Sequence, residues 1–198
     1  MSNTIVGLLR HGQTDWNIDL RLQGTTDIPL NQKGIEQVEH AAKHLRDEWD
    51  LILSSPLSRA KDSAQIVATV LGIDQVVVEP KLLERSFGIG EGMTYAQWQE
   101  QFADLDHIPG AESKSEIEAR AIDLLHHFSD TYKGMRVLTV SHGALIRFVL
   151  SQVTSGAIPP KGERLQNASL HVIRHQGGWS LDAWAPEPLG SDATSNLQ

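Results

Sequence analysis

Five residues whose side chains could together carry out one reaction follow short apolar runs that lie far apart in the chain: Arg10, His11, Arg59, Glu84 and His142. The planar guanidinium of arginine binds two phosphate oxygens at once. A neutral imidazole can attack phosphorus as a nucleophile, and a protonated one can neutralise phosphate charge. A carboxylic acid can protonate the leaving alkoxide, after which its conjugate base can activate water. These residue types therefore indicate phosphoryl transfer without a metal ion.

Each of these residues has a plainer interpretation when it is taken alone. A histidine at the end of a strand is more often structural, and a lone Arg59 or Glu84 would be a solvated surface residue. Their shared placement favours chemistry, because unrelated residues would scatter over both ends of a sheet. The same His-Gly pair follows two of the runs, at 11–12 and 142–143. A glycine at such a point lets the backbone turn tightly and lets a ligand approach closely.

The elements that must position these residues alternate between short apolar runs and longer helical periods. The runs 4–9, 51–53, 76–78 and 137–140 predict strands, because each is short, apolar and bounded by polar residues. Helical periodicity predicts a helix from Gln32 to about Asp47, whose apolar stripe extends to Trp49. Two more helices are predicted: one with Ser55 as N-cap and Pro56 at its first position, ending at Gly72, and one over 144–153.

Two further helices are predicted at capping boxes, at Thr94–Gln97 and at either Ser113–Glu116 or Ser115–Glu118. The runs 168–174 and 179–184 flank a turn that contains glycine, which predicts a hairpin. Strands that alternate with helices form right-handed βαβ units around a mainly parallel sheet. We therefore expect an α/β protein, a three-layer αβα fold with an antiparallel edge. Its ligand should bind at the carboxyl ends of the strands.

Length and composition exclude several other classes of protein. A chain of 198 residues can bury about 70% of its surface on folding, which suits a single domain over 1–185 with a flexible tail over 186–198. The absence of cysteine excludes disulfide scaffolds, thiolate nucleophiles and cysteine-ligated metals. A net charge of -8 disfavours nucleic acid and anionic membranes as partners. No apolar run approaches the ~18 residues of a membrane span, so we expect a cytoplasmic protein.

Longer blocks around the five residues match a known pattern in order: RHGQTDWN at 10–17, RLQG at 21–24, DIPLN at 27–31, KG at 33–34, SSPLSRA at 54–60, LERSFG at 83–88, EG at 91–92, PGAES at 109–113 and SHG at 141–143. These blocks resemble the histidine phosphatase superfamily, which includes phosphoglycerate-mutase-like enzymes. The resemblance runs from about residue 5 to residue 184. The chain departs from many relatives at Ile89-Gly90, where a bulkier and often aromatic residue is usual.

The resemblance implies a role for each matching residue. His11 would be phosphorylated, and Glu84 would act first as proton donor and then as base. Three residues would hold the phosphate: Arg10, Arg59 and His142. Three others are similar to positions that touch phosphate or substrate in the family: Asn17, Gln23 and Gly24. No cofactor and no metal ion are implied, and the partner would be a small phosphorylated metabolite.

The resemblance leaves two activities open, phosphatase and phosphoglycerate mutase. The mutase branch carries a longer insertion between the acid and the second histidine, with cations that hold a second acidic group. Here Glu84 and His142 are 58 positions apart (142 − 84), and 93–117 holds five acidic residues against the single cation Lys114. We therefore expect a phosphatase. A protein that only binds phosphorylated ligands is disfavoured, because binding alone does not need Glu84.

The sequence leaves the substrate and the oligomeric state open, as monomer or homodimer. Tyr95, Trp98 and Phe102 would form the buried face of a short helix, or at least one of them would line the pocket and select the leaving group. His40 and His44 lie one helical turn apart, a spacing that can suit a metal ion, but they lack the glutamate of a metalloprotease motif and are expected on the polar face.

Overall fold

The computed structural model describes residues 3–45 and 49–191, and it contains one six-stranded sheet. The strand order is β3-β2-β4-β1-β5-β6. The strands β1 (Thr4–Arg10), β2 (Leu51–Ser54), β3 (Val76–Val78) and β4 (Arg136–Ser141) are parallel. The hairpin of β5 (Leu170–His175) and β6 (Trp179–Ala183) adds the antiparallel edge. This confirms the predicted sheet.

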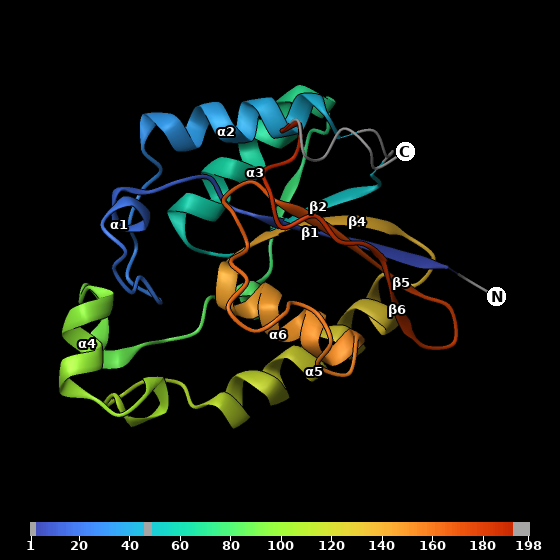
Figure 1. Cartoon of the computed structure of the whole chain (residues 1–198). Helices are drawn as coiled ribbons and strands as arrows, with labels where there is room; N and C mark the ends of the chain where they lie inside the picture. The colour runs from blue at the N-terminus through green and yellow to red at the C-terminus, as the bar shows by residue number, and fades with distance from the viewer. Residues whose placement is uncertain (1–2, 46–48, 192–198) are drawn as a thin grey trace.

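Helices cover both faces of this sheet, as the three-layer prediction requires (Figure 1). The helices α2 (Gln32–Lys43) and α3 (Ser58–Leu71) pack on one face, and α5 (Lys114–Thr131) and α6 (Gly143–Val153) pack on the other. Side chains alternate along β1, so Ile5 and Leu9 enter the first core while Val6 and Leu8 enter the second. Burying each such side chain stabilises the fold by about 1.5–3 kcal/mol.

Short elements surround the carboxyl ends of the strands. The helices α1 (Asp15–Ile18) and α4 (Tyr95–Gln101) lie at this side of the sheet, on the left in Figure 1. Three 3₁₀ turns belong to the same connections, over Pro80–Leu82, Gly88–Gly90 and Leu105–His107. Capping boxes begin α4 at Thr94 and α5 at Ser113, which makes the Ser115 alternative wrong.

The start of α3 was predicted wrongly. Its N-cap is Leu57, and Ser55 and Pro56 precede the helix. The physical reason is that Ser55 is occupied elsewhere: its amide donates to Val140 O at 3.0 Å, which prolongs β2, and its hydroxyl lies 2.7 Å from His142 Nε2. Ser55 therefore stays in extended backbone before the helix and is not its N-cap.

The end of α2 also differs from the prediction. The helix stops at Lys43 with His44 as its C-cap, and the predicted end at Asp47 lies outside the described residues. Trp49 is buried, as the apolar stripe implied, but it reaches the core from the loop before β2. Its ring occupies the space over β1 where a Cβ at Gly7 would come within 2.6 Å.

The described part of the predicted tail lies against the body of the protein. Gln166 N donates to Pro186 O at 2.8 Å, and Leu189 N donates to Ala168 O at 3.0 Å. Leu189 packs on the core beneath α2 and α3. The remainder of the predicted tail, 192–198, lies outside the described residues. Within the described ranges, no helix combines the length and the apolar character that a membrane crossing needs.

Candidate active site

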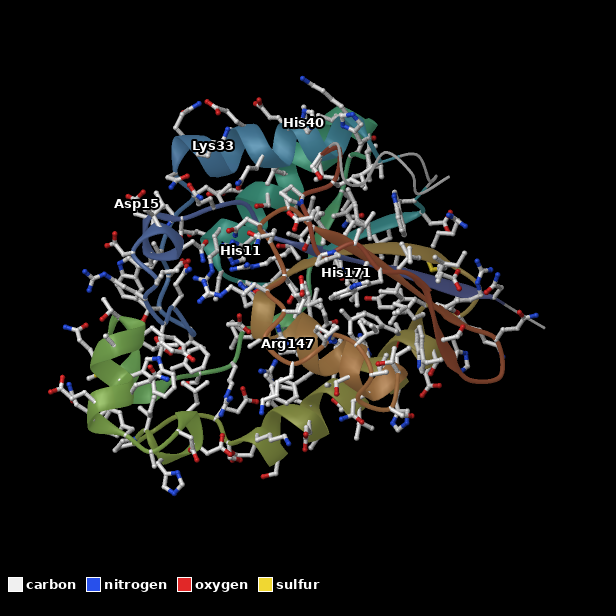
Figure 2. All side chains as sticks on the ribbon, viewed as in Figure 1. His11, Asp15, Lys33, His40, Arg147 and His171 are labelled. Atoms are coloured by element: carbon white, nitrogen blue, oxygen red, sulfur yellow. The ribbon has the colours of Figure 1, made fainter. Side chains whose placement is uncertain are left out.

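The fold brings the five predicted residues together at the carboxyl ends of the strands. Arg10 ends β1 and pairs in register with Ser141 at the end of β4, so His11 and His142 leave neighbouring strands side by side. Their rings lie 5.1 Å apart, centre to centre. Arg59 reaches the same point from α3, with its Nε 3.3 Å from His142 Nδ1. Figure 2 shows His11 at this edge of the sheet.

His11 is held as a neutral imidazole with one nitrogen free. Its Nδ1–H donates to the carbonyl oxygen of Gly12 at 2.6 Å, which leaves the lone pair on Nε2. Burial, and then the charges of Arg10 and Arg59, hold its pKa well below the usual value of 6.5. A second hydrogen bond, from Asn167 Nδ2 to His11 O at 3.0 Å, fixes the backbone of the residue. This is the state in which an imidazole can act as a nucleophile.

His142 is also neutral in the free protein. Its pKa lies well below 6.5, first because of burial and then because the adjacent His11 ring and the charge of Arg59 disfavour a second positive charge here. Nδ1 accepts from Arg59 Nε, so the proton is on Nε2, which donates to Ser55 Oγ at 2.7 Å. The protonated histidine considered from sequence is therefore not the form that this geometry favours before a phosphate binds.

The two arginines of the site are anchored on backbone carbonyls, which leaves their charges available. Arg59 is fully buried and donates to Thr26 O at 2.8 Å and to Gly24 O at 2.7 Å. Arg10 donates through Nη1 to Leu165 O. Its Nε is shielded from solvent and has no hydrogen-bond partner among the described residues. A buried donor without a partner is costly, and a phosphate oxygen would satisfy it.

Glu84 lies at the N-terminus of α6, inside the cavity. Its Oε1 accepts from Leu145 N at 3.0 Å and Arg85 N at 2.8 Å, and its Oε2 accepts from Ala144 N at 3.1 Å. These bonds fix the carboxyl group opposite the guanidinium groups, whose pKa values it influences. The position suits a group that exchanges a proton with a bound ester.

The two His-Gly glycines are needed for close approach and not for a turn. Neither Gly12 nor Gly143 has a positive φ. A Cβ at Gly12 would lie 2.4 Å from Gly34 O in α2, and a Cβ at Gly143 would lie 3.3 Å from Arg10 Nε. The glycines therefore let α2 and the N-terminus of α6 pack directly against the site, which corrects the prediction of tight turns.

The site opens into a cavity of about 490 Å³. Asn17, Gln23 and Gly24 line it, and their contact with phosphate or substrate stays a prediction. Its apolar wall is formed by Trp16, Leu20, Leu22, Phe87, Tyr95, Leu105 and Phe148. Tyr95 is 50% exposed and belongs to this wall, whereas Trp98 is 7% exposed and forms the buried face of α4. Trp98 thus belongs to the buried face and Tyr95 lines the pocket, while Phe102 is half-buried at the end of α4 and outside the cavity lining; a role of Tyr95 in selecting the leaving group stays a prediction.

A comparison with protein-family models matches residues 6–186 to the histidine phosphatase superfamily (branch 1). The chain belongs to this superfamily. A curated relative, the uncharacterized phosphatase PhoE of Bacillus subtilis, is 36% identical over 171 residues, covering 86% of this chain and 88% of the relative. The metal-independent phosphoserine phosphatase of Arabidopsis thaliana is 32% identical over 196 residues, covering 92% and 81%.

A solved structure and a mutase-named relative extend the comparison. The mycobacterial glucosyl-3-phosphoglycerate phosphatase superposes with a TM-score of 0.79 at 29% identity and covers 92% of this chain and 98% of its own. The probable phosphoglycerate mutase GpmB of Yersinia pestis is 32% identical over 203 residues, covering 95% of this chain and 93% of the relative. The short length of the chain therefore does not by itself separate the two activities.

Several residues of the site in this protein were not predicted from the sequence. Asn167, which holds His11, follows a stretch without clear periodicity. Glu91 belongs to a quoted block, but its task was not foreseen: its carboxylate accepts from Thr25 N and Thr26 N at 3.0 and 2.8 Å and so fixes the loop that holds Arg59. Arg147 and Arg164 also line the cavity. Only Arg147 had a usable signal, since it lies one helical turn beyond Gly143.

The two histidines considered as metal ligands make other contacts. His40 Nε2 donates to Gly190 O at 3.0 Å, and His44 Nδ1 donates to His40 O at 2.8 Å. Over residues 3–45 and 49–191, no group of three or more His, Asp or Glu side chains could hold a metal ion.

A third buried histidine, His171, allows a test of how the stability of this protein depends on pH. His171 lies on β5 (Figure 2). Its ring is stacked on Trp184, and burial lowers its pKa to about 3. Below pH ~6.5 the unfolded chain takes up a proton at each such histidine while the folded protein does not. The free energy of unfolding should therefore fall, by about 1.4 kcal/mol per pH unit for each group.

Between pH 6.5 and 5, we expect His171→Leu to reduce the slope of the free energy of unfolding against pH by the contribution of one histidine, about 1.4 kcal/mol per pH unit. Urea unfolding at several pH values, in buffer without phosphate, measures the slope. His126→Leu, at an exposed position of α5, is the matched control. Parallel curves for His171→Leu and the wild type would show that His171 accepts a proton in the folded state.

Proposed function

We propose that this protein is a metal-independent phosphomonoesterase that hydrolyses a small phosphorylated metabolite through a phosphohistidine at His11. The observation that carries the proposal is the free Nε2 of a neutral His11 in a cavity that Arg10 also lines, where Arg10 Nε is a buried donor without a partner among the described residues. Membership of the histidine phosphatase superfamily and the phosphatases among its relatives support it.

In the first step, His11 Nε2 attacks phosphorus and the bond between phosphorus and the ester oxygen breaks. Glu84, entering as the carboxylic acid, gives its proton to the departing oxygen, and the alcohol leaves. Arg10 and Arg59 neutralise the charge on the phosphoryl oxygens, and His142 helps to hold the phosphate. Charge neutralisation by fixed guanidinium groups takes the place that a metal ion holds in other phosphatases.

In the second step, the Glu84 carboxylate takes a proton from water, and the water oxygen attacks phosphorus. The bond between phosphorus and Nε2 breaks, inorganic phosphate leaves, and both His11 and protonated Glu84 are restored. Asn17, Gln23 and Gly24 line the cavity beside His11, where they would contact the phosphate or the ester. We place this activity in the cytoplasm.

Chelation tests the metal-independent part of the proposal. We expect hydrolysis of p-nitrophenyl phosphate to continue unchanged after dialysis against EDTA, because the guanidinium groups of Arg10 and Arg59 supply the positive charge at the phosphate. Initial rates before and after dialysis, each with and without added Mg²⁺, Mn²⁺ or Zn²⁺, measure this. Loss of most activity with recovery on adding one of these ions would contradict the proposal.

A phosphoglycerate mutase is the second candidate, and one observation favours it. Arg147 and Arg164 supply the cavity with the cations that 93–117 lacks. Such groups could retain a carboxylated intermediate until it is phosphorylated again. Turnover of 3-phosphoglycerate with and without a bisphosphate primer separates the candidates, since a phosphatase releases inorganic phosphate and a mutase forms an isomer.

A further inference from the structure

We infer that the cavity holds a second anion site, made by Arg147 and Arg164, and that the preferred substrate is a phosphomonoester with a second anionic group about four to six bonds from the phosphorus atom. The inference rests on the proposed function, because it takes the phosphate to bind at His11. The second group is a carboxylate or a second phosphate, since a guanidinium binds either in the same way.

Helix α6 places Arg147 in line with the phosphate site. Gly143 lies against Arg10, with its Cβ position 3.3 Å from Arg10 Nε. Residues four apart lie on one face of a helix, so Arg147 follows Gly143 about one turn, or ~5–6 Å, further along α6. The pair Ala144 and Phe148 repeats this spacing, and all four residues line the cavity. Figure 2 shows Arg147 on α6, below His11 in this view.

The backbone of segment 163–165 accepts hydrogen bonds from the guanidinium groups of Arg10 and Arg147. The carbonyl of Leu165 accepts from Arg10 Nη1, and the carbonyl of Glu163 accepts from Arg147 Nη2. Arg164 lies between these two carbonyls in the chain and also lines the cavity. Two cations at the cavity, Arg10 and Arg147, are thus hydrogen-bonded to one short segment.

Neither Arg147 nor Arg164 is paired with a carboxylate. Arg147 donates only to a backbone carbonyl, and Arg164 makes no hydrogen bond or ion pair with the described residues. The other two arginines of the wall differ: Arg21 pairs with Asp19, and Arg85 pairs with Asp106. Among the described lining residues, Glu84 is the sole acidic side chain, and it already faces Arg10 and Arg59.

The unpaired charges of Arg147 and Arg164 affect Arg10 at the phosphate site. Burial lowers the pKa of Arg10 to about 10; Glu84 opposes this shift, while the charges of Arg59, Arg164 and Arg147 add to it. Glu163 partly offsets the effect of burial on the pKa of Arg147 but forms no ion pair with it. A ligand with two anionic groups would relieve this repulsion at both ends, whereas a simple phosphate ester would relieve it at one end only.

Matched substrates test the second site. 3-Phosphoglycerate and glycerol 3-phosphate differ by a carboxylate in place of a hydroxymethyl group, and 1,3-propanediol bisphosphate and 3-hydroxypropyl phosphate differ by a phosphate. We expect wild-type kcat/KM to favour the doubly anionic member of at least one pair by about tenfold or more. The preferred pair identifies the group that the site accepts. Ratios near one in both pairs would overturn the inference.

Variants assign the preference to the two arginines. We expect Arg147→Met/Arg164→Met to lose most of the preference, and Lys61→Met, at an exposed position of α3, to keep it. If the double variant fails to fold, Arg164→Met alone is informative, because Arg164 is exposed and should lose part of the preference. A preference that survives in a folded double variant would also overturn the inference.

Calorimetric binding separates this inference from the proposed function. His11→Ala cannot form a phosphohistidine, so the dissociation constants of the two members of each pair report the second site without turnover. If no ester is hydrolysed by the wild type, the proposed function fails. In that case the dissociation constants measured with His11→Ala still test the second site. A preference of about tenfold or more for the doubly anionic member of a pair supports it, and a ratio near one in both pairs contradicts it.

Discussion

Replacing His11 by alanine should lower kcat by about four orders of magnitude or more, because the variant lacks the atom that receives the phosphoryl group. The remaining groups would still bind the ester, since Arg10 and Arg59 are anchored on the carbonyls of Leu165, Thr26 and Gly24 and not on His11. We therefore expect KM to change far less than kcat. Steady-state rates with p-nitrophenyl phosphate and with glycerol 3-phosphate measure both constants.

Two controls make the His11 result specific. His126→Ala removes an exposed imidazole from α5 and should leave the rates unchanged. Urea unfolding should show that His11→Ala is folded, because two hydrogen bonds to the backbone of residue 11 remain. Asn167 Nδ2 donates to its carbonyl oxygen, and its backbone N–H donates to Ser141 O at 3.0 Å. A folded His11→Ala variant with kcat within tenfold of the wild type would mean that another group is the nucleophile.

Replacing Glu84 by glutamine should divide substrates by their leaving groups. An alkyl phosphate needs a proton on its departing oxygen, so kcat/KM should fall by about 10²–10⁴. A nitrophenolate leaves without that proton, so kcat/KM for p-nitrophenyl phosphate should fall by less than about tenfold. The ratio kcat/KM is the right quantity, because it reports the steps up to loss of the alcohol and not the later hydrolysis of phosphohistidine.

The second role of Glu84 appears in a different measurement. Because its carboxylate would also activate water, Glu84→Gln should release one equivalent of nitrophenolate per site quickly and then turn over slowly. Glu100→Gln, at an exposed position of α4, is the matched control and should show neither effect. Equal losses of kcat/KM for alkyl and nitrophenyl esters would remove the role of proton donor from Glu84.

Much of this site could be predicted because its residues stand next to strands. Arg10, His11 and His142 follow runs of buried apolar residues, and parallel strands bring their carboxyl ends to one edge. Nothing more than the parallel arrangement of the strands was needed to place these three side chains at one edge of the sheet. Glu84 was placed correctly for the same reason, since the connection that carries it follows β3.

The residues that were missed act through contacts that no periodicity encodes. Arg164 and Asn167 lie between α6 and β5 in a segment without regular structure, and only the fold shows that its carbonyls hold Arg10 and Arg147. Ser55 was assigned to a helix cap because the Ser-Pro pattern is typical of one. The hydroxyl instead contacts His142, a residue 87 positions away along the chain. Local patterns cannot show which of two partners a side chain takes.

The neutral state of the two site histidines likewise depends on tertiary structure. Burial, together with the charges of Arg10 and Arg59, lowers the pKa of both His11 and His142, and these groups come from separate parts of the chain. A chain with a net charge of -8 nevertheless places six of its 17 lysines and arginines, all of them arginines, around one cavity. The acidic surface then disfavours polyanions, while the cavity accepts a small anion.

Trapping the intermediate tests the central claim most directly. Wild-type protein mixed with a phosphate-labelled ester for milliseconds, quenched in alkali and digested at neutral pH should carry up to one phosphate per chain, on the peptide that contains His11. The label should be stable to alkali and lost in acid, as expected for a phosphohistidine, and the His11→Ala variant should carry none. Label on another residue, or turnover of the ester with no phosphate on the protein at any time, would contradict the account.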